Sequence, residues 1–252
     1  MVRDGRFDAG RRRWLAGVAE TTALAVWPGV GVSADAAVAT VAAAPAAAAE
    51  LDGLVARFGA LPANGEVRRV FAAGPPAGVL LAAVAPQKLL GWPMKLPAQA
   101  RAWMGEPLAD LPYLGRLAGR GSTMPLEALL ELQPDLVLDS GTVDATYLSG
   151  TERLHRQTGL PCVLVQGGLA DSARQLRAVG ALLGESARVE RLAAFADEVL
   201  RLAAQVTRDV SAEQRPRVYL ARGVAGLETA RIGAINAEVI ELAGGRNVAV
   251  ES

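Results

Sequence analysis

The sequence contains few of the residues from which disulfides, metal sites and catalytic triads are built. Its 252 residues include one cysteine, Cys162, and one histidine, His155. A lone cysteine excludes a disulfide within the chain, and a carrier of bare zinc or manganese needs several converging histidines and carboxylates. We therefore expect no metal-ligating residues and no cofactor. Cys162 is expected to pack as a small core side chain and His155 to be exposed on a helix.

An excess of charge of either sign is also lacking. The chain has 26 basic and 26 acidic residues, so its formal net charge is zero. This balance gives no basis for binding nucleic acid or an anionic membrane. Aromatic residues make up only 4% of the chain. The core is therefore expected to consist mainly of small aliphatic side chains.

The short motifs of common α/β enzymes are missing. No G-x-G-x-x-G follows a predicted strand, no G-x-S-x-G occurs, and the glycine-rich stretch 119–122 lacks the lysine of a phosphate-binding loop. With one histidine and one core-like cysteine, a catalytic triad has few possible members. We expect no catalytic residues, and a nucleotide-dependent α/β enzyme is the less favoured alternative.

The N-terminus has the pattern of an export signal. Arg11-Arg12-Arg13-Trp14-Leu15 matches a twin-arginine signal, a mostly apolar run continues to Val32, and small residues suited to cleavage follow. The alternative is a basic start that precedes a core helix. No cysteine follows the run, which favours a soluble periplasmic protein over a lipoprotein. No other stretch is long and apolar enough to span a bilayer.

Composition divides the chain into five parts. We expect a signal peptide over 1–34, an alanine-rich linker and lead-in over 35–65 with one or two helical turns near 51–58, and an N-terminal α/β lobe over 66–171. A helical spine over 172–214 then leads to the start of a C-terminal α/β lobe over 215–252. The spine is read from apolar residues at helical spacing, which predict a short helix and then a long one near 25 residues.

The stretch from Pro125 to Gly141, PLEALLELQPDLVLDSG, illustrates the α/β pattern. Its leucines recur at helical spacing, Pro134 ends the helix, and Leu136-Val137-Leu138 follows as a strand covered on both faces. Around it, strands are expected at 67–73, 88–91, 161–166 and 218–220, and helices at 77–84, 145–158 and 236–243. This alternation is typical of a parallel sheet.

The order of these segments resembles a known family. PLEALLELQPDLVLDSG, TGLPCVLV, a long helix, RPRVYLARG and NAEVIELAGGRNVA are similar to the periplasmic substrate-binding proteins of iron-siderophore, haem and vitamin B12 ABC importers. The resemblance covers Val67 to Val250. It implies two Rossmann-like lobes joined by a long spine helix, with the ligand held between them. Members of that family normally continue beyond the GGRN segment, so the second lobe is expected to be incomplete here.

The resemblance also implies functional residues. Glu127 and Glu241 match the positions at which each lobe docks onto arginines of the permease dimer in the inner membrane. The ligand is expected at strand ends that face the other lobe, and the alternative for its arginines is solvent exposure or local ion pairing. The candidates for ligand binding are Trp92, Arg116, Arg120, Ser140, Thr142, Arg222, Glu228 and Arg231.

The predicted function is that of a monomeric, non-enzymatic, extracytoplasmic binding protein. It would capture a metal that arrives already chelated, as a ferric siderophore, haem or cobalamin, and deliver it to the permease. Among the candidates, Trp92 would stack on a planar ligand and the arginines would pair with its anionic oxygens. The alternative is an exported binding or scaffold protein that has no role in transport. Whether the protein retains a chelate ligand distinguishes the transport protein from this alternative.

Overall fold

The computed structural model describes residues 54–250, except 64, 119–120, 142 and 231. The predicted signal peptide and residues 35–53 of the alanine-rich linker and lead-in lie outside the described residues. Within them, no helix combines the length and hydropathy needed to cross a membrane.

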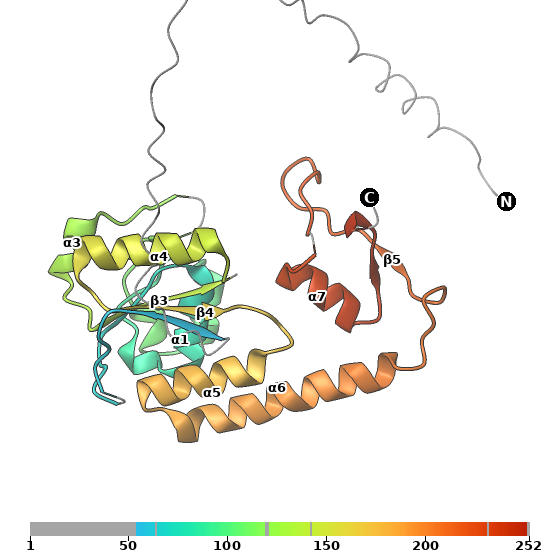
Figure 1. The fold of residues 1–252 in the computed structure, drawn as a ribbon, viewed down its shortest axis with the longest axis horizontal. Coiled ribbons are helices and arrows are strands. Elements are labelled where there is room, and N and C mark those ends of the chain that lie inside the picture. Colours follow the sequence, from blue (N-terminus) through green and yellow to red (C-terminus); the bar gives the residue numbers. More distant parts are fainter. Residues whose placement is uncertain (1–53, 64, 119–120, 142, 231, 251–252) are drawn as a thin grey trace, which may run out of the picture. The chain divides into compact units, whose positions relative to one another are not determined.

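A four-stranded sheet forms the centre of the first lobe (Figure 1). Its strands are β1 (Val55–Phe58), β2 (Val70–Ala72), β3 (Leu136–Gly141) and β4 (Cys162–Gln166), in the order β1-β4-β3-β2. The last three strands run parallel, and β1 pairs antiparallel with β4 at the edge. The α/β class and the parallel sheet predicted from the sequence are confirmed.

Two sequence predictions on strands were wrong. Residues 55–58 form β1 and not helical turns, since Val55 pairs with Val165 and Phe58 with Cys162, so the sheet begins before residue 66. A short apolar run cannot be assigned by periodicity alone, and its partner lies far along the chain. The strand expected at 88–91 is instead a 3₁₀ turn, Pro86–Lys88, followed by one isolated bridge from Leu89 to Val70.

Helices cover both faces of this sheet. Side chains alternate along β3, so Leu136 and Leu138 contact α1 (Pro75–Val84) and α5 (Ser172–Leu183), whereas Val137 contacts the opposite layer. That layer contains α3 (Leu126–Glu131) and α4 (Ala145–Thr158). Leu136, Val137 and Leu138 are almost fully buried. The strand covered on both faces is thus confirmed.

Between α1 and α3 the chain is irregular, because Pro97, Pro107 and Pro112 prevent a long helix there. This stretch contains the short helix α2 (Ala98–Met104) and a 3₁₀ turn, Leu108–Asp110. The segment 112–114 runs beside Trp92, whose backbone N–H donates to the Pro112 carbonyl at 2.7 Å. This hydrogen bond holds the segment 112–114 against the chain at Trp92.

The range 172–214, predicted to be a helical spine, contains α5 and the longer helix α6 (Ser186–Thr207), whose 22 residues extend about 33 Å. The first turns of α6 pack closely on α5, because a Cβ placed on Gly180 would lie 2.8 Å from Cγ2 of Val189. After the spine come β5 (Arg217–Val218), α7 (Ile235–Leu242), β6 (Arg246–Asn247) and a 3₁₀ turn, Val248–Val250. Strands β5 and β6 form a two-stranded parallel sheet.

Candidate functional site

The carboxyl ends of β2, β3 and β4 meet at one edge of the first sheet. The backbone N–H of Gly167 donates to the Gly141 carbonyl at 2.7 Å, and a Cβ on Gly167 would lie 3.2 Å from Cα of Gly141. A side chain on Gly167 would therefore require the two loops to move apart by a few tenths of an ångström. Ligands of α/β proteins bind at this edge of the sheet.

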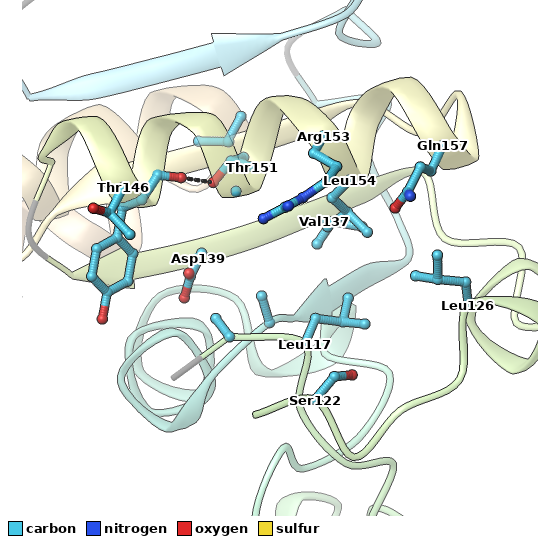
Figure 2. A pocket seen from close by; sticks show the side chains of 15 residues that line it. Leu117, Ser122, Leu126, Val137, Asp139, Thr146, Thr151, Arg153, Leu154 and Gln157 are labelled. Carbon is cyan, nitrogen blue, oxygen red and sulfur yellow. Dashed lines mark hydrogen bonds between the residues drawn. The ribbon is translucent and has the colours of Figure 1, made fainter. Parts of the chain in front are cut away.

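A cavity of about 610 Å³ lies beside this edge, between β3, helix α4 and the described residues Leu117, Ala118, Ser122 and Leu126 (Figure 2). Its walls are largely apolar, with Val137 from the sheet, Leu154 from α4 and Leu117 and Leu126 from the connecting segment. The polar and charged side chains that line it are Ser122, Asp139, Thr146, Tyr147, Thr151, Arg153 and Gln157.

Asp139 is the buried charge of this cavity. Its side chain is on the same face of β3 as Val137, and the residue is only 7% exposed. Burial raises the pKa of Asp139 from 3.8 to about 6, and a hydrogen bond from the backbone N–H of Ser140, 2.9 Å long, opposes this rise. Among the described residues, no cation pairs with this carboxylate.

Helix α4 supplies the opposite wall. It begins at Asp144, whose Oδ1 accepts the backbone N–H groups of Thr146 and Tyr147 at 2.9 Å each. This cap fixes the first turn and the direction of the face that lines the cavity. From the same face the guanidinium of Arg153 extends into the space between α4 and β3 (Figure 2).

The structure contradicts the stacking role predicted for Trp92. The residue is 1% exposed, and its indole Nε1 donates to the Leu108 carbonyl at 2.8 Å. A Cβ on Gly78 of α1 would lie 3.6 Å from the indole ring. Trp92 is therefore a core residue with a satisfied polar atom, and it offers no surface to a ligand.

The other candidate ligand residues have different surroundings. Arg116 is half-buried, and its Nε donates to the Gly121 carbonyl at 3.0 Å, so part of its guanidinium closes its own loop. Ser140 is half-buried at the end of β3. Arg222 and Glu228 are both exposed, and an antiparallel bridge holds them side by side. Arg120, Thr142 and Arg231 lie outside the described residues.

The two candidate docking glutamates are exposed on helices of different segments. Glu127 lies in the first turn of α3, and Glu241 lies near the end of α7. In the part of the chain that the structure describes, neither carboxylate has a hydrogen bond or an ion pair. Both can therefore meet a partner without breaking an existing contact.

The prediction that His155 is exposed was wrong. Its ring is half-buried, with Nδ1 2.8 Å from the Leu160 carbonyl, and a Cβ on Gly59 would lie 2.5 Å from its Cε1. Strand β1 was not predicted, and Gly59, which follows it, packs against the imidazole and covers it. The core role of Cys162 is confirmed, since the residue is fully buried and burial raises the pKa of its thiol to about 12.

The described residues contain no group of three or more histidine, cysteine, aspartate or glutamate side chains arranged to hold a metal ion. The cavity residues Asp139, Tyr147 and Arg153 were not among the predicted site residues. Asp139 carried a signal, because a carboxylate directly follows an apolar strand there. Tyr147 and Arg153 lie on one face of a helix, but only its packing on the sheet shows that this face borders a cavity.

Comparison with known proteins identifies relatives of this fold. The family described as periplasmic binding protein matches residues 79–252. An ABC transporter solute-binding protein of Sulfurospirillum deleyianum is 22% identical with a TM-score of 0.64, over 75% of this chain and 58% of that protein. No curated protein matches the sequence.

Two further structures share the fold. A periplasmic vitamin B12-binding protein of Vibrio cholerae is 19% identical with a TM-score of 0.54, over 74% of this chain and 68% of that one. A periplasmic haem-binding protein of Pseudomonas aeruginosa is 23% identical with a TM-score of 0.53, over 73% and 63%. The chain thus spans about 60–70% of the length of these structures.

Proposed function

The chain belongs to the periplasmic binding protein family, and from this premise we propose that it is the solute-binding component of an ABC importer. It captures a chelated metal, as a ferric siderophore, haem or cobalamin, between two lobes and delivers it to the permease dimer of the inner membrane. The observation that carries this proposal is the family match over 79–252, which includes helices α1 to α7 almost completely.

The proposed ligand is a chelate and not a bare ion. A protein that binds a transition metal directly supplies several histidine, cysteine or carboxylate ligands to it. This chain has one histidine, whose Nδ1 is within hydrogen-bond distance of a backbone carbonyl, and one cysteine, which is fully buried. Relatives whose names refer to vitamin B12 and haem support the same class of ligand.

The ligand is proposed to lie against the carboxyl edge of the first sheet. Ser140 lies at that edge, and Arg116 begins the loop that lines the neighbouring cavity. Arg222 and Glu228 present charged groups from the second segment, and Arg120, Thr142 and Arg231 are further proposed contacts. Arginine pairs well with carboxylate, hydroxamate and catecholate oxygens because its planar fork can donate two parallel hydrogen bonds.

Export and docking complete the proposal. Residues 1–34 act as a twin-arginine signal, and the mature protein is a periplasmic monomer. Residues 66–171 and 215–252 are proposed to contribute to separate lobes, with 172–214 as the spine. Glu127 and Glu241, one from each lobe, pair with arginines of the permease. Exposed carboxylates favour the rate and orientation of such an encounter.

Native mass spectrometry of the purified protein tests ligand capture. The panel is haem, cobalamin, a ferric hydroxamate, a ferric catecholate and molybdate, each with its metal-free or apo counterpart where one exists. The proposal predicts a one-to-one adduct with one of the chelates and a clear preference for the metal-loaded form. Retention of molybdate alone would overturn the chelate class. Retention of none would favour the exported scaffold without a transport role.

A further inference from the structure

The cavity beside β3 holds two opposite charges that do not neutralise each other. Asp139 faces it from the sheet and Arg153 from α4. An Asp139–Arg153 ion pair is absent from the part of the chain that the structure describes, and Arg153 has no recorded hydrogen bond there. A buried carboxylate without a cation is unfavourable, because burial removes water without supplying a counter-charge. The arrangement is complementary to a ligand that carries both charges.

We propose that this cavity binds a compact zwitterion with an apolar body, of the type of an α-amino acid with an apolar side chain. The ligand's ammonium group meets Asp139, its carboxylate meets Arg153, and its apolar part lies against Val137, Leu126 and Leu154. All the residues that line the cavity belong to the first lobe, between Ala73 and Val163. The proposal is therefore independent of the chelate proposed for the space between the lobes.

Asp139 determines where the ammonium group binds. The carboxylate is more than nine-tenths buried and has only the Ser140 N–H recorded as a donor among the described residues. An ionised carboxylate has lone pairs for several hydrogen bonds, so acceptor capacity remains unused. A primary ammonium supplies up to three donors and a full positive charge. Binding of the ligand's ammonium group therefore replaces the hydration that the Asp139 carboxylate lost on folding.

Arg153 determines where the carboxylate binds. It lies on the exposed part of α4, and its guanidinium reaches back over the cavity (Figure 2). Its neighbour Arg156 is held at 3.6 Å from Glu152 on the same helix, whereas Arg153 has no such acidic partner among the described residues. A guanidinium binds a carboxylate through two parallel hydrogen bonds, which also fixes the orientation of the ligand.

The size and walls of the cavity suit such a molecule. Its volume of about 610 Å³ is within the usual range of small-molecule sites, roughly 300–1,000 Å³. Eight of the 15 lining residues are apolar and seven are polar or charged, so the cavity offers an apolar surface together with polar contacts. A cavity formed only by imperfect packing would not require two unneutralised charges to face it.

The proposed site has a defined pH dependence. Among the described residues that line the cavity, the titratable or charged groups besides Asp139 are Arg153 and Tyr147, both from α4. Because burial raises the pKa of Asp139 to about 6, the carboxylate is mostly ionised at pH 7.5 and mostly protonated at pH 5. Affinity for the zwitterion should therefore fall as the pH is lowered.

Three probes of nearly equal shape test the proposal by isothermal titration calorimetry at pH 7.5. L-phenylalanine carries both charges, phenethylamine only the ammonium, and 3-phenylpropanoate only the carboxylate. We expect L-phenylalanine to bind at least about tenfold more tightly than either analogue, which corresponds to about 1.4 kcal/mol. Its affinity should fall by a similar factor at pH 5. Equal binding of all three probes, or no saturable binding of L-phenylalanine, would overturn the proposal.

Variants assign the two charged contacts. Asp139→Asn should weaken L-phenylalanine at least about tenfold and leave 3-phenylpropanoate unchanged, whereas Arg153→Gln should weaken both. Arg156→Gln, on the same helix, is the matched control and should bind as the unaltered protein does. Circular dichroism checks that each variant is folded. Unchanged affinity in the folded Asp139 or Arg153 variant would contradict the assigned contact and with it the proposal.

Discussion

The first sheet and the second sheet differ in how completely they are covered. The four strands β1 to β4 have helices on both faces, and Leu136, Leu138, Val163 and Leu164 have no exposed surface. The two strands β5 and β6 have two residues each, and Arg217 of β5 is exposed. Burial of apolar area is the dominant stabilising term in folding, so stability is expected to concentrate in the first lobe.

Exposed apolar side chains show the same difference. Four large hydrophobic residues before the spine are exposed, whereas ten are exposed from Phe195 onward within the described residues. On α6, Phe195, Val199, Leu202 and Val206 recur at helical spacing and form one uncovered stripe. Apolar residues therefore recur regularly along α6, but within the described structure their side chains are not buried as those of the first sheet are.

The largest expected effect comes from a matched pair of leucines. Leu138→Ala removes a fully buried side chain from the centre of the sheet and should cost about 2–5 kcal/mol of unfolding free energy. Leu202 is 45% exposed on α6, and Leu202→Ala should change stability by no more than about 0.5 kcal/mol. Urea denaturation measures both. Equal losses would show that the stripe on α6 is buried in solution, and the comparison would fail.

The second-largest expected effect is the loss of stability caused by the buried carboxylate of Asp139 in the first lobe. The folded pKa of Asp139, about 6, exceeds its ordinary value of 3.8, so the folded state binds this proton more tightly than the unfolded state does. The resulting stabilisation is present below pH 4 and is lost as the pH rises through 6. Asp139→Asn should therefore be more stable than the unaltered protein by about 2–3 kcal/mol at pH 7.5.

The same comparison at pH 3.5 provides the control. The stability advantage of the Asn variant should largely disappear there, because Asp139 is then protonated in both folded and unfolded states. Denaturation at several pH values follows the difference. An advantage that does not vary with pH would mean that the carboxylate is neutralised by a partner, and the charge arrangement inferred for the cavity would be wrong.

The smallest effect distinguishes two helical glycines. Gly180 of α5 faces Val189, whose side chain a new Cβ would approach to 2.8–3.1 Å, so Gly180→Ala should destabilise by about 1–3 kcal/mol. Gly150 of α4 has no atom within 4 Å of that position, and Gly150→Ala should stabilise by up to about 1 kcal/mol through helix propensity. Thermal denaturation should show shifts of opposite sign. Shifts of the same sign would contradict the close packing of α5 on α6.

Local signals explain why much of the first lobe could be predicted. Helix α4 has the predicted bounds, since Asp144 caps its start and Gly159, with φ of 70°, ends it. Strand β3 follows directly from its apolar run after Pro134. Strand β1 could not be predicted in this way, because only its pairing with β4, far along the chain, makes those residues a strand.

The candidate site was less predictable because it depends on tertiary contacts. Trp92 was expected at a strand end that a ligand could reach, but the indole is buried through contacts with Leu108 and α1. The cavity arises where the face of α4 meets β3, and no spacing within either element shows the gap between them. The sequence predicted where β2, β3 and β4 end and that these ends share one edge of the sheet. It did not predict which side chains at that edge face open space.

The most direct test of the transport role measures binding of the protein to its permease complex in nanodiscs. The double variant Glu127→Lys with Glu241→Lys reverses one exposed carboxylate from each segment, and Glu106→Lys with Asp209→Lys makes the same change in net charge at exposed positions outside α3 and α7. We expect the first pair to raise the Kd at least about tenfold and the control pair to change it little. Equal Kd values for the first pair and the unaltered protein would contradict this expectation.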